Sequence, residues 1–419
     1  MASSADLPTS YWHATFPPPA PDDLLPAETE VAVIGAGMLG CWTAYWLAQR
    51  GIGVTVIERE VVSWGATGRN GGFLVGGAAM GYSDAIAAFG RETAADIWRL
   101  SEEGRSLAAQ VIADEGIACD YRMTGTLSLG LSDEGLASAS RNAALLRADG
   151  LAAEVLDRAA VQELIATPLG PEIAGAALAP HGGILHSGRY LAGIAAAARR
   201  HGACFTKATV TGIGLDTQGG IAVDTSRGRV RAGRVVVAAN AWSDDLVPAF
   251  AGKMVPVRGQ ILAYEPTSPV FTTAVGADVT PTGEYWQQTP DGSIVIGGCR
   301  AVAPNGDRDV RAMVTTPDVT EAIEAVLPRL FPELTGLAVS RRWAGLMAFT
   351  SDFLPVADAV PEMPGVWAAG GFCGHGMPFG PVFGKLLAEA SVTGEAPAAL
   401  EPFRLNRPTL RPLAAASAS

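Results

Sequence analysis

Residues 31–58 read VAVIGAGMLGCWTAYWLAQRGIGVTVIE, and this stretch decides the fold. Residues 31–34 are a short apolar strand, and a glycine-rich turn follows over residues 35–40. Residues 39–50 then show helical spacing with Gly51 after them, and residues 54–57 form a second buried strand that ends at Glu58. This change of period predicts a strand–helix–strand unit in a parallel sheet.

The turn carries the pattern Gly-x-Gly-x-x-Gly, which is typical of dinucleotide binding. Gly35 permits the tight turn, Gly37 lets the main chain approach a pyrophosphate, and Gly40 lets helix and strand pack closely. The helix N-terminus then faces the phosphates. Glu58 is placed to accept hydrogen bonds from ribose hydroxyls and would repel a 2′-phosphate, so an NADP-type ligand is disfavoured. We also expect ligand contacts at Ala36, Met38, Leu39 and Arg59.

Two further glycine-rich stretches favour a longer ligand. Residues 64–72 (WGATGRNGG) directly follow the acid, and residues 370–378 (GGFCGHGMP) stand between an apolar strand and a helix. Turns of this kind expose main-chain N–H groups to phosphates or to a reduced flavin ring. Three such turns suggest FAD, which touches a sheet along its length. The cofactor contacts expected here are Gly65, Ala66, Thr67, Arg69, Asn70, Gly71, Gly72, Gly371, Gly374, His375, Gly376 and Met377.

Composition excludes several classes of function. The chain has 419 residues, 48% hydrophobic and 17% charged, which is enough apolar material for sizeable cores. A net charge of −12 without a cluster of basic residues argues against a nucleic-acid partner. The five cysteines are widely spaced and form no CxxC pair, so neither a metal site nor a disulfide framework is expected. We expect a cytoplasmic protein without a signal peptide.

The uncharged run 31–49 is nearly long enough to span a membrane. Its three glycines and the strand that follows favour the strand–helix–strand unit instead, so no membrane span is expected. The sequence carries no signal for an oligomeric state.

The order of predicted elements divides the chain into two discontinuous parts. Residues 1–27 are a proline-rich arm that Tyr11, Trp12 and Phe16 attach to the body. Residues 28–92, 150–247 and 343–401 are predicted to form the cofactor domain, and residues 93–149 and 248–342 a mostly antiparallel substrate domain. Residues 402–419 are predicted to be a mobile tail.

Five segments resemble the D-amino-acid-oxidase-like family of FAD-dependent oxidoreductases, closest to its γ-glutamylputrescine-oxidase and sarcosine-oxidase branch. They are 33–37 (VIGAG), 65–72 (GATGRNGG), 255–260 (VPVRGQ), 344–352 (AGLMAFTSD) and 371–376 (GFCGHG). The resemblance spans nearly the whole chain. It implies an α/β fold (α+β overall), with a glutathione-reductase-like FAD domain and an inserted antiparallel substrate domain. It also implies that Val210 contacts adenine through its main chain.

Departures from the family pattern narrow the chemistry that the resemblance implies. Met347 stands where amino-acid oxidases of the family have an arginine for the substrate carboxylate, which favours an amine or a differently anchored substrate. No cysteine occurs between residues 341 and 352, so FAD is expected to be non-covalent. Pro378 replaces a lysine, and a rough alignment places Val295 where sarcosine oxidases have an oxygen-activating lysine, so a dehydrogenase stays open.

Candidate catalytic and pocket residues come from the same segments. The stretch Tyr285-Trp286-Gln287 lies on a predicted strand and is expected to line the substrate pocket, although ordinary strand packing explains it equally well. His375 and Arg69 are expected at the flavin, where a structural or positioning role competes with catalysis. Arg258 is either a pocket residue or an ion-pair partner in the core, and Arg341, Arg342 and Trp343 are weaker pocket candidates. Cys373 is expected to be a packing residue.

The predicted function is oxidation of the C–N bond of an amine, or of an N-substituted amino acid, to an imine by hydride transfer to flavin N5. Oxygen or another acceptor would then take the electrons. Two alternatives stay open: a flavin monooxygenase or hydroxylase, and a non-catalytic FAD-bearing subunit of a multi-chain dehydrogenase. The first lacks support, because no Asp follows the glycine pair Gly370-Gly371.

Overall fold

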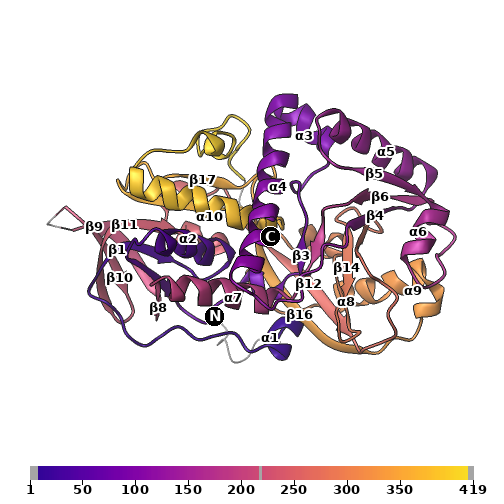
Figure 1. Ribbon diagram of the computed structural model, residues 1–419, viewed down its shortest axis with the longest axis horizontal. Helices are drawn as coiled ribbons and strands as arrows, with labels where there is room; N and C mark the ends of the chain where they lie inside the picture. The colour runs from indigo at the N-terminus through magenta and orange to yellow at the C-terminus, as the bar shows by residue number, and fades with distance from the viewer. Residues whose placement is uncertain (1–7, 217–218, 414–419) are drawn as a thin grey trace.

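The computed structural model describes residues 8–216 and 219–413, and two large sheets organise them (Figure 1). The predictions for residues 1–7 and 414–419 of the arm and tail lie outside this range. The first sheet has the order β17-β18-β11-β1-β2-β8, with β10 and β9 extending from β11. Its strands are β1 Glu28–Ile34, β2 Val54–Glu58, β8 Cys204–Lys207, β9 Val210–Leu215, β10 Ile221–Thr225, β11 Gly228–Val237, β17 Val356–Ala359 and β18 Val366–Gly370.

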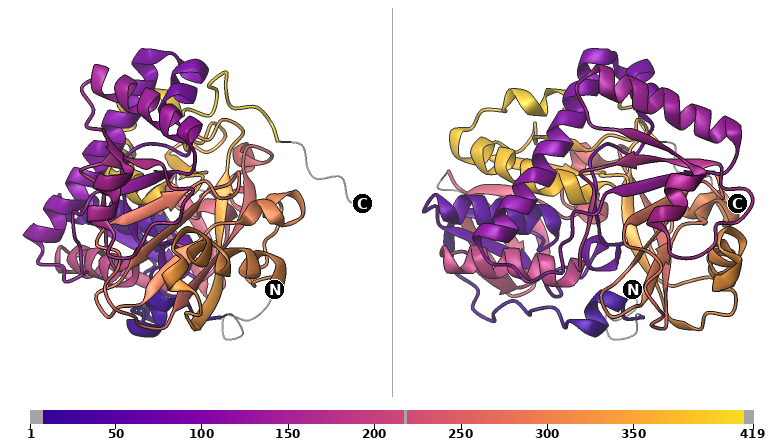
Figure 2. Two further views of the ribbon diagram at one scale, coloured as in Figure 1. Left: turned by 90° about the vertical axis from the view of Figure 1, so that its right-hand side faces the viewer. Right: turned by 45° about the vertical axis from the view of Figure 1, so that its right-hand side comes forward.

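The centre of this sheet is parallel, as the strand–helix–strand motif predicts. Strand β1 pairs in parallel with β2 and β11, while β17, β10 and β9 pair antiparallel at the margins. Long helices cover it: α2 Met38–Gln49, α4 Arg91–Asp114, α7 Ser187–Arg200 and α10 Gly376–Thr393. Figure 2 (right) shows the yellow helix α10 beside the indigo elements of this part, away from the orange strands.

The second sheet is antiparallel except for one pair. Its order is β16-β12-β15-β14-β13-β4-β6-β5, and only β13 and β4 run parallel. The strands are β4 Thr126–Gly130, β5 Glu154–Asp157, β6 Gly175–Ala179, β12 Val255–Tyr264, β13 Ala274–Ala277, β14 Glu284–Gln288, β15 Ile294–Gly297 and β16 Val339–Phe349. The helices of this part are α5 Asp133–Ala148, α6 Arg158–Leu164, α8 Pro317–Glu324 and α9 Val326–Leu330. Helix α3 Tyr82–Phe89 packs on α4 and belongs to the core of the first part. The predicted α/β fold with an antiparallel substrate domain is confirmed.

Two predicted domain boundaries differ from the packing. Strands β5 and β6 were assigned to the cofactor domain but pair with β4 in the second sheet, and β16 starts before residue 343 in that sheet. Helix α4 was assigned to the substrate domain but packs its buried stripe on α2 and α10. Gly104 makes this contact possible, since a Cβ there would lie 1.9 Å from the carbonyl oxygen of Pro378.

The described parts of the N-terminal arm and of the C-terminal segment are both attached to the body. The arm contains a short helix, α1 Tyr11–Thr15, which buries Tyr11 and Trp12; the sequence had predicted only their attachment. Figure 1 shows α1 below β16. At the other end, the residues between 402 and 413 are not a free tail: Leu410 is buried, and Arg407 forms an ion pair with Asp352. The prediction of a mobile tail is therefore wrong for this stretch.

Candidate active site

A single large cavity of about 1230 Å³ runs from the carboxyl ends of β1, β2 and β11 to the face of the second sheet. All three glycine-rich turns and strands β12, β14 and β16 contribute to its walls. Most of the residues predicted to bind the cofactor line it: Gly35, Gly37, Met38, Leu39, Glu58, Arg59, Gly65, Ala66, Thr67, Arg69, Asn70, Gly71, Val210, Gly374, His375, Gly376 and Met377.

Four of the residues predicted to bind the cofactor do not line the cavity but support the turns that do. Gly40 packs against the turn, where a Cβ would lie 1.8 Å from the carbonyl oxygen of Gly35. The Ala36 N–H donates to the Glu58 carboxylate at 2.7 Å. The Gly371 N–H donates to Asn240 at 3.3 Å, and Gly72 leaves room for the Gln287 side chain. These residues set the form of the turns without lining the cavity.

The first turn presents its main chain to the cavity. Gly37 caps α2 without a side-chain hydrogen bond, so N–H groups of the first helical turn stay available, and only that of Met38 donates to Thr67. A Cβ on Gly37 would meet nothing in the protein closer than Thr67, at 3.7 Å, because the space beside it is the cavity itself. Burial raises the pKa of Glu58, whose oxygens accept the N–H groups of Ala36 and Glu60.

Two tryptophans and an arginine form the wall beside Glu58. The Arg59 guanidinium lies 4.5 Å from the ring centre of Trp242 and 5.3 Å from that of Trp64. All three line the cavity. Trp242 was not predicted from the sequence, although it follows β11, a parallel strand whose carboxyl end faces the cavity, and this is the usual position for ligand contacts.

Arg69 ties three segments together at the middle of the cavity. Its guanidinium donates to the main-chain oxygens of Trp64, Pro8 and Ala344, each at 3.1 Å. Burial lowers the pKa of Arg69 to about 10. Asn70 is similarly engaged, since its side-chain oxygen accepts from Gly72 and Ser187. These contacts assign positioning to both residues.

The third turn brings the N-terminus of α10 to the same cavity. His375 caps this helix without a side-chain hydrogen bond, and its Nδ1 finds no partner among the described residues although it is buried. Burial lowers the pKa of His375, so the ring is neutral at physiological pH. The helix N-terminus therefore supplies partial positive charge to the cavity.

The face of the second sheet closes the other end of the cavity. Tyr285 on β14 and Met347 on β16 both line it. Burial raises the pKa of Tyr285 to about 12, so its hydroxyl remains a donor. Two further residues line the cavity here that were not predicted from the sequence, Arg300 and Phe349. Their side chains are in contact, with the guanidinium 5.0 Å from the ring centre.

Several predicted pocket residues do not line the cavity. Trp286 points to the opposite face of β14 and packs with Phe271 and Phe331, because neighbouring strand residues face opposite sides. Gln287 shares the face of Tyr285, but its amide is used by the main-chain oxygens of Gly71 and Gly72. The predictions for Trp286 and Gln287 are therefore wrong.

Arg258 forms an ion pair in the core, which was the alternative to a place in the substrate pocket. Its guanidinium binds both carboxylate oxygens of Asp307, at 2.7 and 2.9 Å, and both side chains are buried. The weaker candidates are elsewhere too: Arg341 is exposed, Arg342 pairs with Glu324, and Trp343 donates to the main chain of Arg69.

Two other residues that the sequence singled out are part of hydrophobic packing. Val295 is buried with Trp12, Ile261 and Trp343 and does not reach the cavity, so its expected place near the flavin is wrong. Cys373 is buried, with its Sγ close to Thr350, as a packing residue would be. The structure thus gives no reason to connect Val295 with the electron acceptor.

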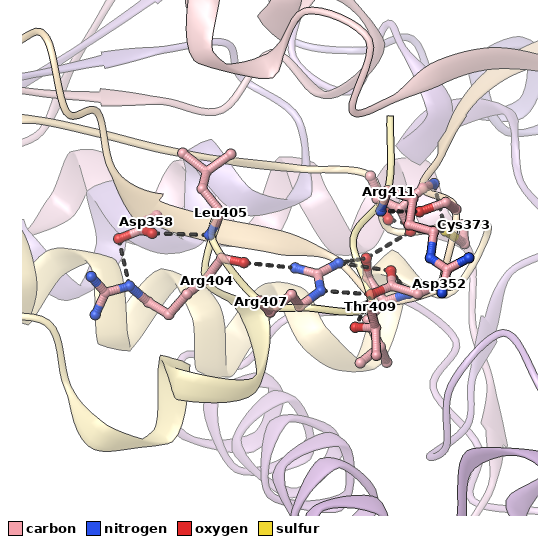
Figure 3. Close-up of polar contacts among 12 residues, drawn as sticks. Asp352, Asp358, Cys373, Arg404, Leu405, Arg407, Thr409 and Arg411 are labelled. Atoms are coloured by element: carbon pink, nitrogen blue, oxygen red, sulfur yellow. Dashed lines mark hydrogen bonds and ion pairs between the residues drawn. The ribbon is translucent and has the colours of Figure 1, made fainter. Parts of the chain in front are cut away.

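The segment after α10 forms part of the cavity rim, where Thr409 and Arg411 line the cavity. Asp352 anchors this segment by accepting hydrogen bonds from Arg407 and Thr409 (Figure 3). The Arg407–Asp352 pair is bidentate, at 2.7 and 2.8 Å, and both side chains are 6% exposed. The stretch around Thr409 and Arg411, which was predicted to be mobile, is therefore part of the site.

The residues present fit an extended dinucleotide of the FAD type. One continuous space connects the open main chain at Gly37 and the carboxylate of Glu58 with the N-terminus of α10 and the second sheet. Its volume of about 1230 Å³ leaves room for a second, smaller ligand at the far end. Within residues 8–216 and 219–413, no group of His, Cys, Asp and Glu is arranged to hold a metal ion.

No helix in the described part of the chain combines the length and apolar character needed to cross a bilayer.

Comparison with known proteins agrees with this geometry. γ-Glutamylputrescine oxidoreductase of Escherichia coli K12 is 29% identical over 395 residues, covering 91% of this chain and 88% of that protein. Sarcosine oxidase subunit beta of Rhodobacter capsulatus is 27% identical over 411 residues, covering 95% and 92%.

Solved structures share the fold. Glycine oxidase from Geobacillus kaustophilus superposes with a TM-score of 0.79 at 22% identity, covering 91% of this chain and 99% of that one. L-Proline dehydrogenase from P. horikoshii gives a TM-score of 0.77 at 25% identity, covering 91% and 98%. The family described as FAD dependent oxidoreductase (DAO) matches residues 30–390. This chain therefore belongs to the DAO family of FAD-dependent oxidoreductases, and its cofactor is FAD.

Proposed function

We propose that this enzyme oxidises the C–N bond of an amine, or of an N-substituted amino acid, to an imine. One observation carries the proposal: a single cavity joins the three glycine-rich turns to the substrate face formed by Tyr285 and Met347. A ligand on that face shares space with FAD held by the turns. The amine-oxidising relatives named above support the same class of reaction.

FAD, when bound, supplies an acceptor for the hydride that leaves the carbon next to the nitrogen. The protein's own part is to hold the substrate and keep its nitrogen neutral. Arg69, Arg300 and the N-terminus of α10 place positive charge around the cavity, which disfavours an ammonium ion. The nitrogen then gives up its proton to solvent as the imine forms, and water converts the imine to a carbonyl compound and a released amine.

Among the residues that the structure describes, no side chain at the substrate end is suited to act as a strong base. The Tyr285 hydroxyl stays protonated because burial raises its pKa to about 12, and burial lowers the pKa of His375. The carboxylates that line the cavity are placed otherwise: Glu58 accepts N–H groups of Ala36 and Glu60, Asp352 is paired with Arg407, Asp245 lies near Arg311, and Asp84 is exposed on α3. We therefore assign His375, Tyr285 and Arg69 to binding and positioning.

The residue at position 347 bears on the substrate. The Met347 side chain lines the cavity and its Sδ lies 3.4 Å from the place a Cβ on Gly374 would take. A thioether offers no charge to an α-carboxylate at this position. We therefore favour amines over α-amino acids.

Anaerobic mixing of the FAD-loaded protein with a panel of amines tests this proposal. Primary or secondary amines are expected to bleach the flavin band near ~450 nm, and α-amino acids are not. Bleaching by α-amino acids alone would contradict the role given to Met347. If the protein holds FAD but no amine reduces it, a non-catalytic subunit of a larger dehydrogenase is the better assignment. A subsequent pulse of oxygen distinguishes an oxidase from an enzyme that uses another acceptor.

A further inference from the structure

Arg300 is a cation at the substrate end of the cavity that has no anionic partner in the described part of the chain. It begins the short helix η5 Arg300–Val302 directly after the second sheet, and it is half-buried. No carboxylate of the described residues lies within ion-pair distance of it, and its one hydrogen bond, to the main-chain oxygen of Gly306, is long at 3.5 Å. The nearby Asp307 is already bound on both oxygens by Arg258. A partly desolvated guanidinium in this state favours an incoming anion.

A second free donor faces the same space. The Tyr285 hydroxyl makes no hydrogen bond to any described residue, and Tyr285 lines the cavity beside Arg300. Gly297, its partner across β14 and β15, leaves room for this hydroxyl, since a Cβ there would lie 2.7 Å from the phenol oxygen. The ring of Phe349 supports the Arg300 guanidinium from another side. One cation and one neutral donor match a group of single negative charge.

The position of this pair differs from that of Met347. Phe349, on which Arg300 rests, follows Met347 by two residues on the same face of β16, which displaces it by about 7 Å along the strand. Met347 adjoins Gly374 in the turn before α10, and Phe349 packs with Cys373 of that turn on one side and with Phe353 toward the rim on the other. An anion at Arg300 would therefore lie several bonds away from a group bound beside Met347.

We propose that Arg300 and the Tyr285 hydroxyl bind a carboxylate at the end of the substrate distant from the oxidised carbon. The substrate class is then an amine that carries a remote carboxylate, rather than an α-amino acid or a simple alkylamine. This inference rests on the amine oxidation proposed above and names the substrate class for the same site.

A binding measurement that needs no turnover tests the assignment. Pentanoate is titrated by calorimetry into the FAD-loaded wild type and into Arg300→Gln, Arg300→Lys, Tyr285→Phe and Arg341→Gln. Arg341 is an exposed arginine on β16 outside the cavity, so its variant is the matched control for lost charge. We expect Arg300→Gln to weaken pentanoate binding by about 10- to 100-fold, Tyr285→Phe by about 5-fold, and Arg341→Gln to leave it unchanged. Arg300→Lys should retain part of the affinity.

Equal affinity in the wild type and Arg300→Gln would overturn the assignment, as would an equal loss in Arg341→Gln. FAD content and thermal unfolding of each variant establish that it is folded, and Tyr285→Phe offers a second measurement should Arg300→Gln fail to fold. Anaerobic reduction by 5-aminopentanoate and by pentylamine then follows. In the wild type we expect 5-aminopentanoate to reduce the flavin at a lower concentration than pentylamine does. In Arg300→Gln the two amines should reduce the flavin at similar concentrations. If neither amine bleaches the flavin, amine oxidation fails as the function, while the pentanoate titration still decides the role of Arg300.

Discussion

Alanine at Gly37 and at Gly40 should separate cofactor binding from folding, although the two glycines belong to one turn. A Cβ on Gly40 would lie 1.8 Å from the carbonyl oxygen of Gly35, and the shortest tolerable distance is 3.0 Å. The helix and the turn would therefore have to move apart until the two atoms reach that distance. Helix α2 has no room to retreat, because Gly384 of α10 already lies against Trp42. We expect Gly40→Ala to destabilise the protein without cofactor by about 1–3 kcal/mol or more.

Gly37→Ala should behave differently. Gly37 has φ −82°, which alanine adopts readily, and its Cβ would meet no protein atom within 3.4 Å. The unfolding free energy of the cofactor-free protein should therefore stay within about 0.5 kcal/mol of the wild type. The added methyl group projects into the cavity and holds the pyrophosphate away from the main chain. Loss of one or two charge-assisted hydrogen bonds would weaken FAD binding by about 100-fold.

Urea unfolding with and without FAD measures both quantities. At an FAD concentration of about 100 times its wild-type Kd, the cofactor adds about 2.7 kcal/mol to the wild type but only about 0.4 kcal/mol to a variant with 100-fold weaker binding. If Gly37→Ala retains the full stabilisation by FAD, the main chain at Gly37 does not hold the pyrophosphate. If Gly40→Ala without FAD is as stable as the wild type without FAD, the close contact of Gly40 with the turn does not determine stability.

Three further predictions concern other parts of the structure. Arg407→Ala leaves the buried Asp352 carboxylate uncompensated and should cost about 3–5 kcal/mol in urea unfolding, with a smaller loss for Arg407→Lys; a change below about 0.5 kcal/mol would contradict the ion pair's role. Burial lowers the pKa of His13 to about 4, so the unfolded chain binds a proton below about pH 6.5 that the folded arm does not, and stability should fall as pH drops from 6.5 toward 4. The free energy of unfolding, measured at pH 7.5 and at pH 5.0, gives the size of this loss, which should be smaller by about 1 kcal/mol in His13→Gln than in the wild type. The same pH dependence in both proteins would contradict the role of His13. Because burial also lowers the pKa of His375, kcat/KM for an amine should rise with pH toward the pKa of the free amine, near ~10, without an inflection near 6.5; an acidic limb that disappears in His375→Gln would disprove this.

Local chemistry explains what the sequence alone determined. The strand–helix–strand unit, its glycine turn and Glu58 lie within one short stretch, and each depends on main-chain geometry that the residue type itself controls. The two other glycine-rich turns were recognisable for the same reason, since each stands between a strand and a helix or directly after the acid. These features were sufficient for the fold class and for one side of the cavity.

Pairing between distant segments decided the rest. Trp286 and Tyr285 are neighbours in sequence, yet which of them faces the cavity depends on which side of the second sheet meets the first. Arg258 finds its acid in Asp307, and Asp352 finds Arg407 at the chain end that composition had marked as mobile. Neither ion pair could be predicted from the neighbouring sequence, because the paired residues meet only after β12, β16 and α10 have packed.

Arg300 shows this limit most clearly. Nothing around it in the sequence distinguishes an arginine paired on the surface from one left without an anion in a cavity. Its exposure depends on Phe349, Tyr285 and the turn before α10, which come from separate parts of the chain. The sequence determined where the cofactor's phosphates bind, because glycine controls the main chain locally. Only the tertiary structure decided what faces the substrate, because the charge of a side chain is balanced by neighbours that folding brings together.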